Sequence, residues 1–245
     1  MNVQAIKLGN FKVNQQKQFS YLLPNDESTD LKMAIQPFLI HTSDDCILID
    51  TGFSFSDQDH PLINEALLAK NISPNDITKV LLSHLHKDHI EGLGFFSENG
   101  FVQMFPNATI YIQKREYDYA ISQTESHSYN QELLQAIKEL PNIFWLNEDT
   151  GKITPNISFE VTGGHTAFHQ VFWYKNEDNI YFFGGDNLPN RSYLKRPIAY
   201  KTDFDGKKAR EYRKIWEQKA IDEEWIIMLY HDMRIPFLEI KKTSE

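Results

Sequence analysis

Short apolar runs, rich in β-branched and aromatic residues, recur along the whole chain. Runs of this length and composition are typical of strands that are buried on both faces. They predict strands over residues 38–40, 46–49, 80–82, 109–112, 157–161, 171–174, 180–183 and 226–229. The runs at residues 46–49, 80–82, 180–183 and 226–229 are each followed within three residues by an Asp or a His, namely Asp50, His84, Asp186 and His231. Strand ends are where functional side chains usually lie in layered folds.

Segments with helical periodicity lie between the predicted strands. They cover residues 61–70, 115–123, 131–139 and 207–220. In the last of these segments the helical period predicts one shared face for Ala209, Tyr212, Ile215, Trp216 and Ala220. Interleaved strands and helices indicate a layered α/β or α+β domain. Because no Gly/Ser-rich or Pro-rich linker interrupts the pattern, we expect residues 1–245 to form a single domain.

Composition and charge narrow the classes of partner. The chain has 25 Lys and Arg against 34 Asp and Glu, a net charge of −9, which argues against a protein that binds phosphate backbones. We therefore expect no nucleic-acid partner. Residues 225–230 form the most apolar stretch near the C-terminus. That stretch is about a third of the ~18 residues that suggest a membrane span, so no membrane association is expected.

Cysteine usage indicates the compartment and the kind of metal site. The single Cys46 cannot form an internal disulfide or a Cys-rich metal site, so any metal must be held by His and carboxylate side chains. The first residues lack the basic and apolar regions of a signal peptide. Both observations favour a reducing, cytoplasmic location.

A cluster of three His and one Asp follows the apolar run at residues 78–82. Its members are His84, His86, Asp88 and His89. Two residues that are two positions apart in an extended turn project the same way, so His84 and His86 can reach one cation. Asp88 and His89 begin the next turn and point to a neighbouring position. This geometry suits two metals better than one.

Further ligands are expected at other strand ends. A catalytic zinc needs about three protein ligands, and a pair of metals needs about twice that number together with bridging groups. Three short segments that adjoin predicted strands offer them, at His165, Asp186 and His231. Paired glycines precede His165 and Asp186, and they would allow the backbone to approach an ion closely.

These motifs, in this order, resemble those of the metallo-β-lactamase fold hydrolases. The match comprises Asp50-Thr51-Gly52, the loop from His84 to His89, and the separate residues His165, Asp186 and His231. The resemblance implies an α+β fold, an αββα sandwich of two mixed β-sheets flanked by helices. It also implies that His84, His86 and His165 hold the first metal. Asp88, His89 and His231 would hold the second metal, and Asp186 would bridge the two.

Other residues are given supporting or structural roles. Asp50 would steady the ligand loop through hydrogen bonds, as ligating imidazoles require, or else it serves only as a turn residue before Gly52. His169 is either a residue that supports the site or a structural histidine. The remaining histidines belong to no motif and are expected at the surface, namely His41, His60 and His127.

The expected chemistry is hydrolysis by a hydroxide that bridges two metals. Two divalent ions lower the pKa of a shared water to about 7 and polarise the oxygen of a carbonyl or phosphoryl group. A small ester, lactone or phosphoester is the expected substrate, and Asp88 is the candidate catalytic residue that orients the hydroxide. Zn²⁺ is the metal that the resemblance favours, although Mn²⁺, Fe²⁺ and Co²⁺ suit the same ligands.

The resemblance points to the lactonase, glyoxalase II and organophosphate hydrolase branches. Glyoxalase II is disfavoured because only 14 residues follow His231. Lactonases of this kind often carry a Tyr three residues beyond the bridging Asp, where this chain has Pro189. Arg191 and Tyr193, in the loop that follows, are the candidate substrate contacts.

Three other classes remain open at this point. One is a mononuclear iron enzyme resembling persulfide dioxygenases, which would use an overlapping set of ligands. Another is a nuclease on the same fold, which the net charge of −9 disfavours. A third is a non-catalytic binding module, which is hard to reconcile with a complete ligand set. The sequence makes no prediction of oligomeric state.

Overall fold

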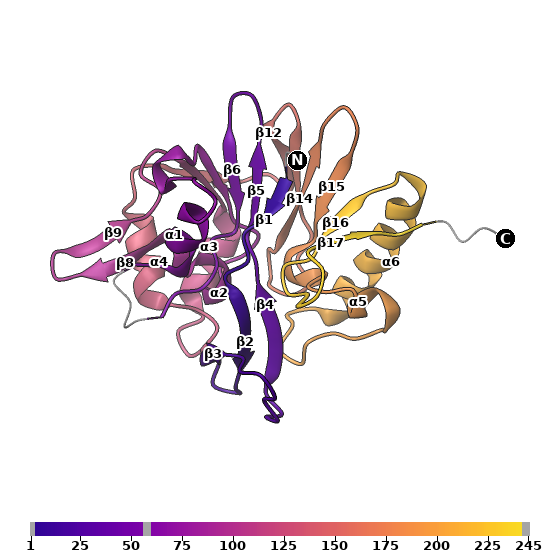
Figure 1. Cartoon of the computed structure of the whole chain (residues 1–245), viewed down its shortest axis with the longest axis horizontal. Coiled ribbons are helices and arrows are strands. Elements are labelled where there is room, and N and C mark those ends of the chain that lie inside the picture. The colour runs from indigo at the N-terminus through magenta and orange to yellow at the C-terminus, as the bar shows by residue number, and fades with distance from the viewer. Residues whose placement is uncertain (1–2, 56–59, 242–245) are drawn as a thin grey trace. The chain divides into compact units, whose positions relative to one another are not determined.

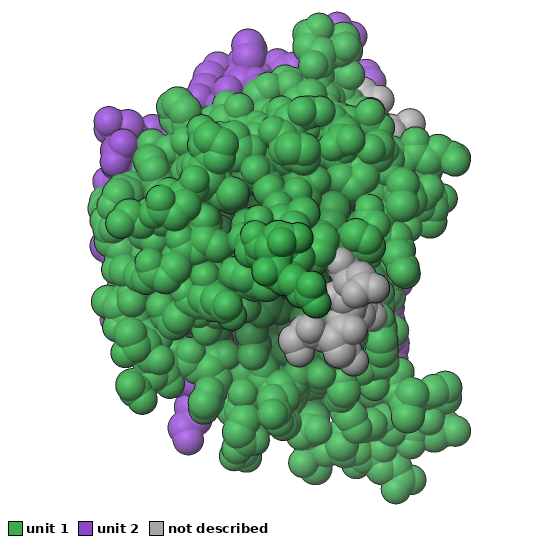
Figure 2. Space-filling view, turned by 90° about the vertical axis from the view of Figure 1, so that its left-hand side faces the viewer, with its two compact units in different colours: residues 1–146 green, residues 147–245 purple. Residues whose placement is uncertain are grey.

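The computed structural model describes residues 3–55 and 60–241 (Figure 1). The chain divides into two compact units, residues 1–146 and residues 147–245 (Figure 2). Each unit contains a six-stranded sheet of mixed parallel and antiparallel strands, with helices packed beside it. The predicted α+β class with two mixed sheets is therefore confirmed. That residues 1–245 form one domain stays a prediction.

The sheet of the first unit brings two polar strand ends to one edge. β5 pairs antiparallel with β1 and β6, and β6, β7, β10 and β11 run parallel to one another. Because parallel neighbours end at the same edge, Asp50 after β6 and Ser83 after β7 emerge side by side. In spatial order the strands are β1 (Val3–Ala5), β5 (Phe38–His41), β6 (Cys46–Ile49), β7 (Lys79–Leu81), β10 (Thr109–Gln113) and β11 (Ile143–Leu146).

The helices of this unit cover the apolar side chains of its sheet. In Figure 1, α1, α3 and α4 gather on one side of the sheet. Leu67, Leu134 and Ile137 of these helices are fully buried in one cluster with Leu48 and Val80 of the strands. The helices are α1 (Leu62–Leu68), α2 (Lys87–Ile90), α3 (Lys114–Ser122) and α4 (Gln131–Lys138), with short 3₁₀ turns η1 (Pro74–Asp76) and η2 (Glu91–Leu93).

Two smaller sheets in the first unit were not predicted from the sequence. One is an antiparallel sheet of β2 (Gly9–Val13), β3 (Phe19–Tyr21) and β4 (Leu31–Ile35), in the spatial order β3-β2-β4. β8 (Gly94–Ser97) and β9 (Gly100–Gln103) form a hairpin. These strands are short or interrupted by Gly, Lys, Asn and Ser, so they lack the continuous apolar run that marks a strand buried on both faces.

The sheet of the second unit brings three polar strand ends to one edge. β13, β14 and β15 alternate in direction, and β16 runs parallel to β15, so β13, β15 and β16 point the same way. His165, Asp186 and His231 follow the ends of these strands closely. The strands in spatial order are β12 (Thr150–Thr154), β13 (Ile157–Val161), β14 (Gln170–Lys175), β15 (Ile180–Phe183), β16 (Ile226–Met228) and β17 (Phe237–Glu239).

The long helix of the second unit packs against its sheet. α6 (Gly206–Asp222) lies beside β15 and β16 in Figure 1. Its Trp216 and Ala220 are buried in one cluster with Phe182 of the sheet. The unit also contains α5 (Ser192–Lys195) and the 3₁₀ turn η3 (Gly185–Asn187). One expectation is wrong, because Ile215 is 51% exposed. At 100° per residue it lies about 120° away from the direction of Ala209, and so outside the buried stripe.

All the strands and helices predicted from the sequence are present, and their ends agree within two residues. Among residues 3–55 and 60–241, none of the helices combines the length and the apolar character that crossing a membrane would require.

Candidate metal centre

In the first unit, Asp50 connects the polar residues at the strand ends through hydrogen bonds. Its side chain is fully buried and accepts hydrogen bonds from the backbone N–H and the hydroxyl of Ser83, both at 2.8 Å. Nδ1 of His89 lies 2.7 Å from Oδ2 of the same carboxylate. Asp50 has φ +55°, a left-handed conformation that Asp and Asn adopt more readily than other residues with a side chain.

These contacts fix which nitrogen of each imidazole can bind a metal. A carboxylate only accepts, so Nδ1 of His89 carries the proton and Nε2 is the ligating atom. The hydroxyl of Ser83 donates to Asp50, so it accepts from Nδ1 of His84 at 3.1 Å. His84 therefore also presents Nε2. One buried carboxylate orients two imidazoles, directly in His89 and through Ser83 in His84.

Backbone contacts tie the segment Asp50-Thr51-Gly52 to the histidine loop. The N–H and the hydroxyl of Thr51 both donate to the carbonyl of His89, at 2.8 and 3.0 Å. The N–H of Gly92 donates to the carbonyl of Gly52 at 3.3 Å. A Cβ on Gly92 would lie 2.0 Å from the carbonyl oxygen of Thr51, so position 92 accepts only glycine without a local shift.

His86 and Asp88 complete the histidine loop. The ring centroid of His86 lies 4.7 Å from that of His84 and 4.8 Å from that of Tyr129. The backbone N–H of Lys87 donates to the carbonyl of Ser128 at 2.9 Å, which anchors the loop to the segment before α4. α2 begins after His86, so the chain turns there and separates the His84–His86 pair from Asp88.

Glu91, directly after α2, was missed from the sequence. It accepts hydrogen bonds from the side-chain amide of Asn130 at 3.1 Å and from the N–H of Ser54 at 3.4 Å. Burial raises the pKa of the Glu91 carboxyl to about 7. The side chain links the segment after Gly52 to the start of α4. Both contacts depend on the tertiary structure, so no sequence motif indicates them.

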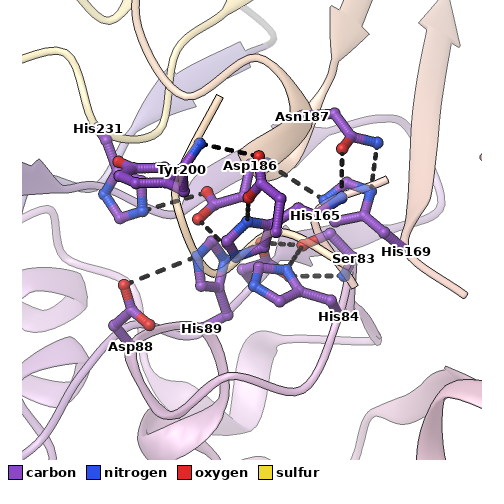
Figure 3. A network of polar contacts seen from close by, with 12 residues as sticks. Ser83, His84, Asp88, His89, His165, His169, Asp186, Asn187, Tyr200 and His231 are labelled. Carbon is purple, nitrogen blue, oxygen red and sulfur yellow. Dashed lines mark hydrogen bonds and ion pairs between the residues drawn. The ribbon is translucent and has the colours of Figure 1, made fainter. Parts of the chain in front are cut away.

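In the second unit, Asp186 lies between two histidines. Its Oδ2 is 3.4 Å from Nε2 of His165, and its Oδ1 is 3.1 Å from Nε2 of His231 (Figure 3). All three side chains are buried. The carboxylate thus directs one oxygen toward each imidazole.

Asp203 orients His165 and was also missed from the sequence. Its Oδ1 lies 2.7 Å from Nδ1 of His165, and its Oδ2 accepts from the N–H of Tyr200 at 2.9 Å. The carboxylate leaves Nε2 of His165 as the ligating atom, just as Asp50 does for His89. No spacing or motif marks Asp203, which lies in an irregular loop.

Asn187 and Arg213 hold the turns that carry His165 and Asp186. The side-chain oxygen of Asn187 accepts from the N–H of His165 at 2.8 Å, and its amide donates to the carbonyl of Gly163 at 2.6 Å. Nη1 of Arg213 donates to the carbonyl of Asn187 at 2.6 Å. Neither residue was assigned a role from the sequence.

His169 stabilises the turn that carries Asp186. It is fully buried, and its Nε2 accepts from the backbone N–H of Asp186 at 3.2 Å. The N–H of His231 donates to the carbonyl of Pro189 at 2.8 Å, so the segment after η3 also anchors His231. These contacts fit the supporting role expected of His169, which stays a prediction.

The candidate substrate contacts have structural partners. The backbone N–H of Arg191 lies 3.3 Å from Oδ2 of the buried Asp232, and Nε of Arg191 lies 3.6 Å from the same oxygen. The ring of Tyr193 lies 5.1 Å from the guanidinium of Arg213, and burial raises the pKa of Tyr193 to about 12. Roles of Arg191 and Tyr193 in substrate binding stay predictions. The three histidines expected at the surface are exposed, namely His41, His60 and His127.

The donor set fits divalent metal ions. The candidate ligands offer imidazole nitrogens and carboxylate oxygens, which suit Zn²⁺, Mn²⁺, Fe²⁺ and Co²⁺. Each belongs to a group of ligand atoms that could hold a metal ion; they are His84, His86, Asp88, His89, His165, Asp186 and His231. Cys46 is buried in the apolar core of the first unit and is not part of the donor set.

Comparisons with known proteins agree with this picture. A family model described as the metallo-beta-lactamase superfamily matches residues 34–231. An N-acyl homoserine lactonase of Bacillus cereus is 24% identical over 225 residues, which cover 83% of each chain.

Two solved structures show the same fold. A probable metal-dependent hydrolase from Staphylococcus aureus has a TM-score of 0.81 at 19% identity, covering 99% of this chain and 93% of that one. AidC, a dizinc quorum-quenching lactonase in complex with a product, has a TM-score of 0.70 at 23% identity, covering 88% of this chain and 82% of that one. These likenesses confirm the fold class predicted from the sequence.

Proposed function

The chain belongs to the metallo-beta-lactamase superfamily of metal-dependent hydrolases, and from that premise we propose that it is a dinuclear hydrolase of a small ester, lactone or phosphoester. The observation that carries the proposal is the position of Asp186. Its two oxygens face Nε2 of His165 and Nε2 of His231, at 3.4 and 3.1 Å. A carboxylate that offers one oxygen to each of two imidazole ligands has the arrangement that a bridging ligand needs.

The proposed ligands of the first metal are His84, His86 and His165. Those of the second metal are Asp88, His89 and His231, and Asp186 would serve both. The hydrogen bonds of Nδ1 support these assignments, because Asp50, Ser83 and Asp203 leave Nε2 of the three histidines that they contact as the ligating atom. Zn²⁺ is the proposed metal, in line with the dizinc lactonase of the same fold.

Two divalent ions at this site would supply a water of lowered pKa as nucleophile and would polarise the carbonyl or phosphoryl oxygen of the substrate. The chain's own residues position the ligands and handle protons. Asp50 and Asp203 fix the orientation of the imidazoles. We propose that Asp88 accepts the proton of the attacking water, since its carboxylate has a second oxygen beyond the one that binds a metal.

Among the substrate classes we favour a lactone. The relative from Bacillus cereus is named an N-acyl homoserine lactonase, and AidC is a lactonase. Pro189 occupies the position at which such enzymes often have a tyrosine. We propose that Tyr200 contacts the substrate in its place, because its ring centroid lies 5.7 Å from that of His165, one of the proposed ligands. Tyr193 contacts Tyr200, with ring centroids 5.6 Å apart.

Elemental analysis paired with substrate turnover tests the proposal. The purified protein would be assayed for bound metals and for hydrolysis of an acyl lactone, an aryl ester and a phosphotriester, before and after chelation. Two metals per chain with chelator-sensitive hydrolysis of the lactone is the expected result. A single iron without hydrolysis would overturn it and favour an oxygenase. Hydrolysis of the phosphotriester alone would keep the dinuclear hydrolase but overturn the preference for a lactone.

The Asp186→Asn variant tests the bridging role separately. We expect the bound metal to fall from two ions per chain toward one, with hydrolysis reduced by about 100-fold or more, since an amide is a weak bridging ligand. Asp178→Asn is the matched control, because Asp178 is exposed and lies in a turn of the same unit. Retention of two metals and full turnover in Asp186→Asn would contradict the bridging role.

A further inference from the structure

A cleft of about 440 Å³ in the second unit has a strongly basic lining. It lies between residues 193–197, which include the end of α5, and one face of α6. Six of its lining side chains are cationic, namely Lys195, Arg196, Lys207, Arg210, Arg213 and Lys214. The lining contains two carboxylates, Glu211 and Glu217. The cleft is therefore positive in a chain whose net charge is −9.

The cations along α6 are placed on one face by the helical period. Lys207, Arg210 and Lys214 are three and four residues apart, so they are neighbours on the helix surface. Like charges at these spacings repel one another, and an anion between them would relieve that repulsion. Nζ of Lys207 lies 3.9 Å from Oε1 of Glu211, and no other cation of the cleft forms an ion pair within residues 3–55 and 60–241.

Arg213 places a buried positive charge in the lining. It is 3% exposed, and its guanidinium donates to the backbone carbonyls of Asn187 and Ile198. The ring of Tyr193 lies 5.1 Å from the guanidinium. Its hydrogen-bond partners are thus neutral carbonyls, and the carboxylate of Asp203 interacts with its charge through space. An anion in the cleft would interact with Arg213 at reduced dielectric screening.

From this lining we propose that the cleft between residues 193–197 and α6 binds a small anion that carries phosphate groups. Three of the cations are arginines, whose planar guanidinium matches two phosphate oxygens at once. The volume falls in the range of about 300–1,000 Å³ that is typical of small-molecule pockets. The site contains none of the proposed metal ligands, so it goes beyond the proposed hydrolysis.

Calorimetric titration with pyrophosphate and with ADP tests the proposal. Phosphates also bind metal ions, so each titration is made on the metal-loaded protein and on the variant Arg210→Gln/Lys214→Gln. The matched control is Lys152→Gln/Lys175→Gln, which removes the same charge from exposed positions of the same unit. We expect the cleft variant to bind pyrophosphate about 10-fold or more weakly than the control variant. Equal affinities in the two variants would overturn the proposal.

Two further readouts separate the possible ligands. Hydrogen exchange with pyrophosphate present should protect residues 193–197 and 207–217, and protection confined to the proposed metal ligands would overturn the proposal. Tighter binding of ADP than of pyrophosphate would support it and show that a nucleoside contributes, and equal binding would support it with phosphate as the recognised group. A single-stranded oligonucleotide that binds more tightly than both, with a steep salt dependence, would overturn it in favour of a nucleic-acid site.

Discussion

Oδ1 of Asp203 lies 2.7 Å from Nδ1 of His165, and this contact determines which nitrogen of the imidazole can bind a metal. The other oxygen of Asp203 accepts from the backbone N–H of Tyr200 at 2.9 Å. The carboxylate therefore orients a proposed ligand and also stabilises the turn in which it lies. Asp50 stands in the same relation to His89, so each unit contains one buried carboxylate that orients a proposed metal-binding histidine.

Asp203→Asn should weaken metal binding without unfolding the protein. In an asparagine an NH₂ group replaces one of the two carboxylate oxygens, so a donor would face either His165 or the N–H of Tyr200 in place of an acceptor. Residues that orient a ligating histidine typically contribute about 10–100-fold to metal affinity, and we expect a loss of that size for zinc. Competition with a chromogenic chelator measures it. Asp178→Asn, at an exposed turn, serves as the control, and a zinc affinity of Asp203→Asn equal to that control would refute the positioning role.

Asp50→Asn should weaken metal binding and also destabilise the metal-free protein. The left-handed backbone at position 50 is compatible with Asn, so the substitution changes the side-chain contacts and not the backbone. Asn cannot accept from Ser83 and His89 in all three hydrogen bonds, and the loss of a buried charged acceptor costs about 1.5–3 kcal/mol. Chemical denaturation of the metal-free variant gives the change in the free energy of unfolding.

The control for Asp50→Asn is Asp44→Asn, which changes an exposed acid in the turn before β6. Unfolding free energies that agree between these two variants would mean that the Asp50 network contributes nothing to the fold. If only the zinc affinity fell, Asp50 would act on the site alone.

The sequence predicted the strands that are buried on both faces because these strands read as unbroken apolar runs. β6 and β15 are examples, and their ends agree with the prediction. It did not predict β3, whose three residues include Ser20 and leave Tyr21 exposed. Such a strand is stabilised by its pairing with β2, which a local pattern does not reveal.

The same distinction applies to the site. His84 and its neighbours form a dense motif, so the sequence alone marked them as candidate ligands. Asp203 lies 38 positions from His165, and the two meet only because the loop before α6 folds back onto the turn after β13. Arg213 lies in a helix that the sequence predicted. Its hydrogen bond to the carbonyl of Asn187 joins two separate elements, so no local pattern reveals it. The residues that hold the ligands in place could therefore be identified only from the structure.

Gly92→Ala should destabilise the first unit through close contacts with Thr51. A Cβ at position 92 would lie 2.0 Å from the carbonyl oxygen of Thr51, and a backbone atom held by neighbouring hydrogen bonds cannot move aside cheaply. Overpacking of this kind costs about 1–3 kcal/mol. Thermal unfolding of the metal-free protein checks the prediction. Ala66→Gly, in α1, is a useful comparison, since it should lose the helix propensity of about 1 kcal/mol and the packing of one partly buried methyl group.

The reactivity of Cys46 should report on the burial of the first unit's core. Burial raises the pKa of this thiol to about 11, from 9.0 in an exposed position, and the negative charges of Asp76 and Asp45 add to the effect. The thiolate is the form that reacts with iodoacetamide, and a shift of this size lowers its fraction at pH 8 by about 100-fold. Because the chain has a single cysteine, mass spectrometry follows the reaction without ambiguity.

We expect alkylation at pH 8 to be about 100-fold slower in the native protein than in denaturant, and to accelerate about 10-fold for each pH unit up to pH 11.

The raised pKa of Cys46 also determines how the stability of the fold depends on pH. Below pH 9 the thiol is protonated in both states, and between pH 9 and 11 the unfolded state ionises first, so the folded state loses stability as the pH rises. Cys46→Ala should remove that part of the alkaline loss, which denaturation curves at pH 8 and 10.5 would measure. Native alkylation as fast as in denaturant would show instead that the thiol is neither buried nor shifted.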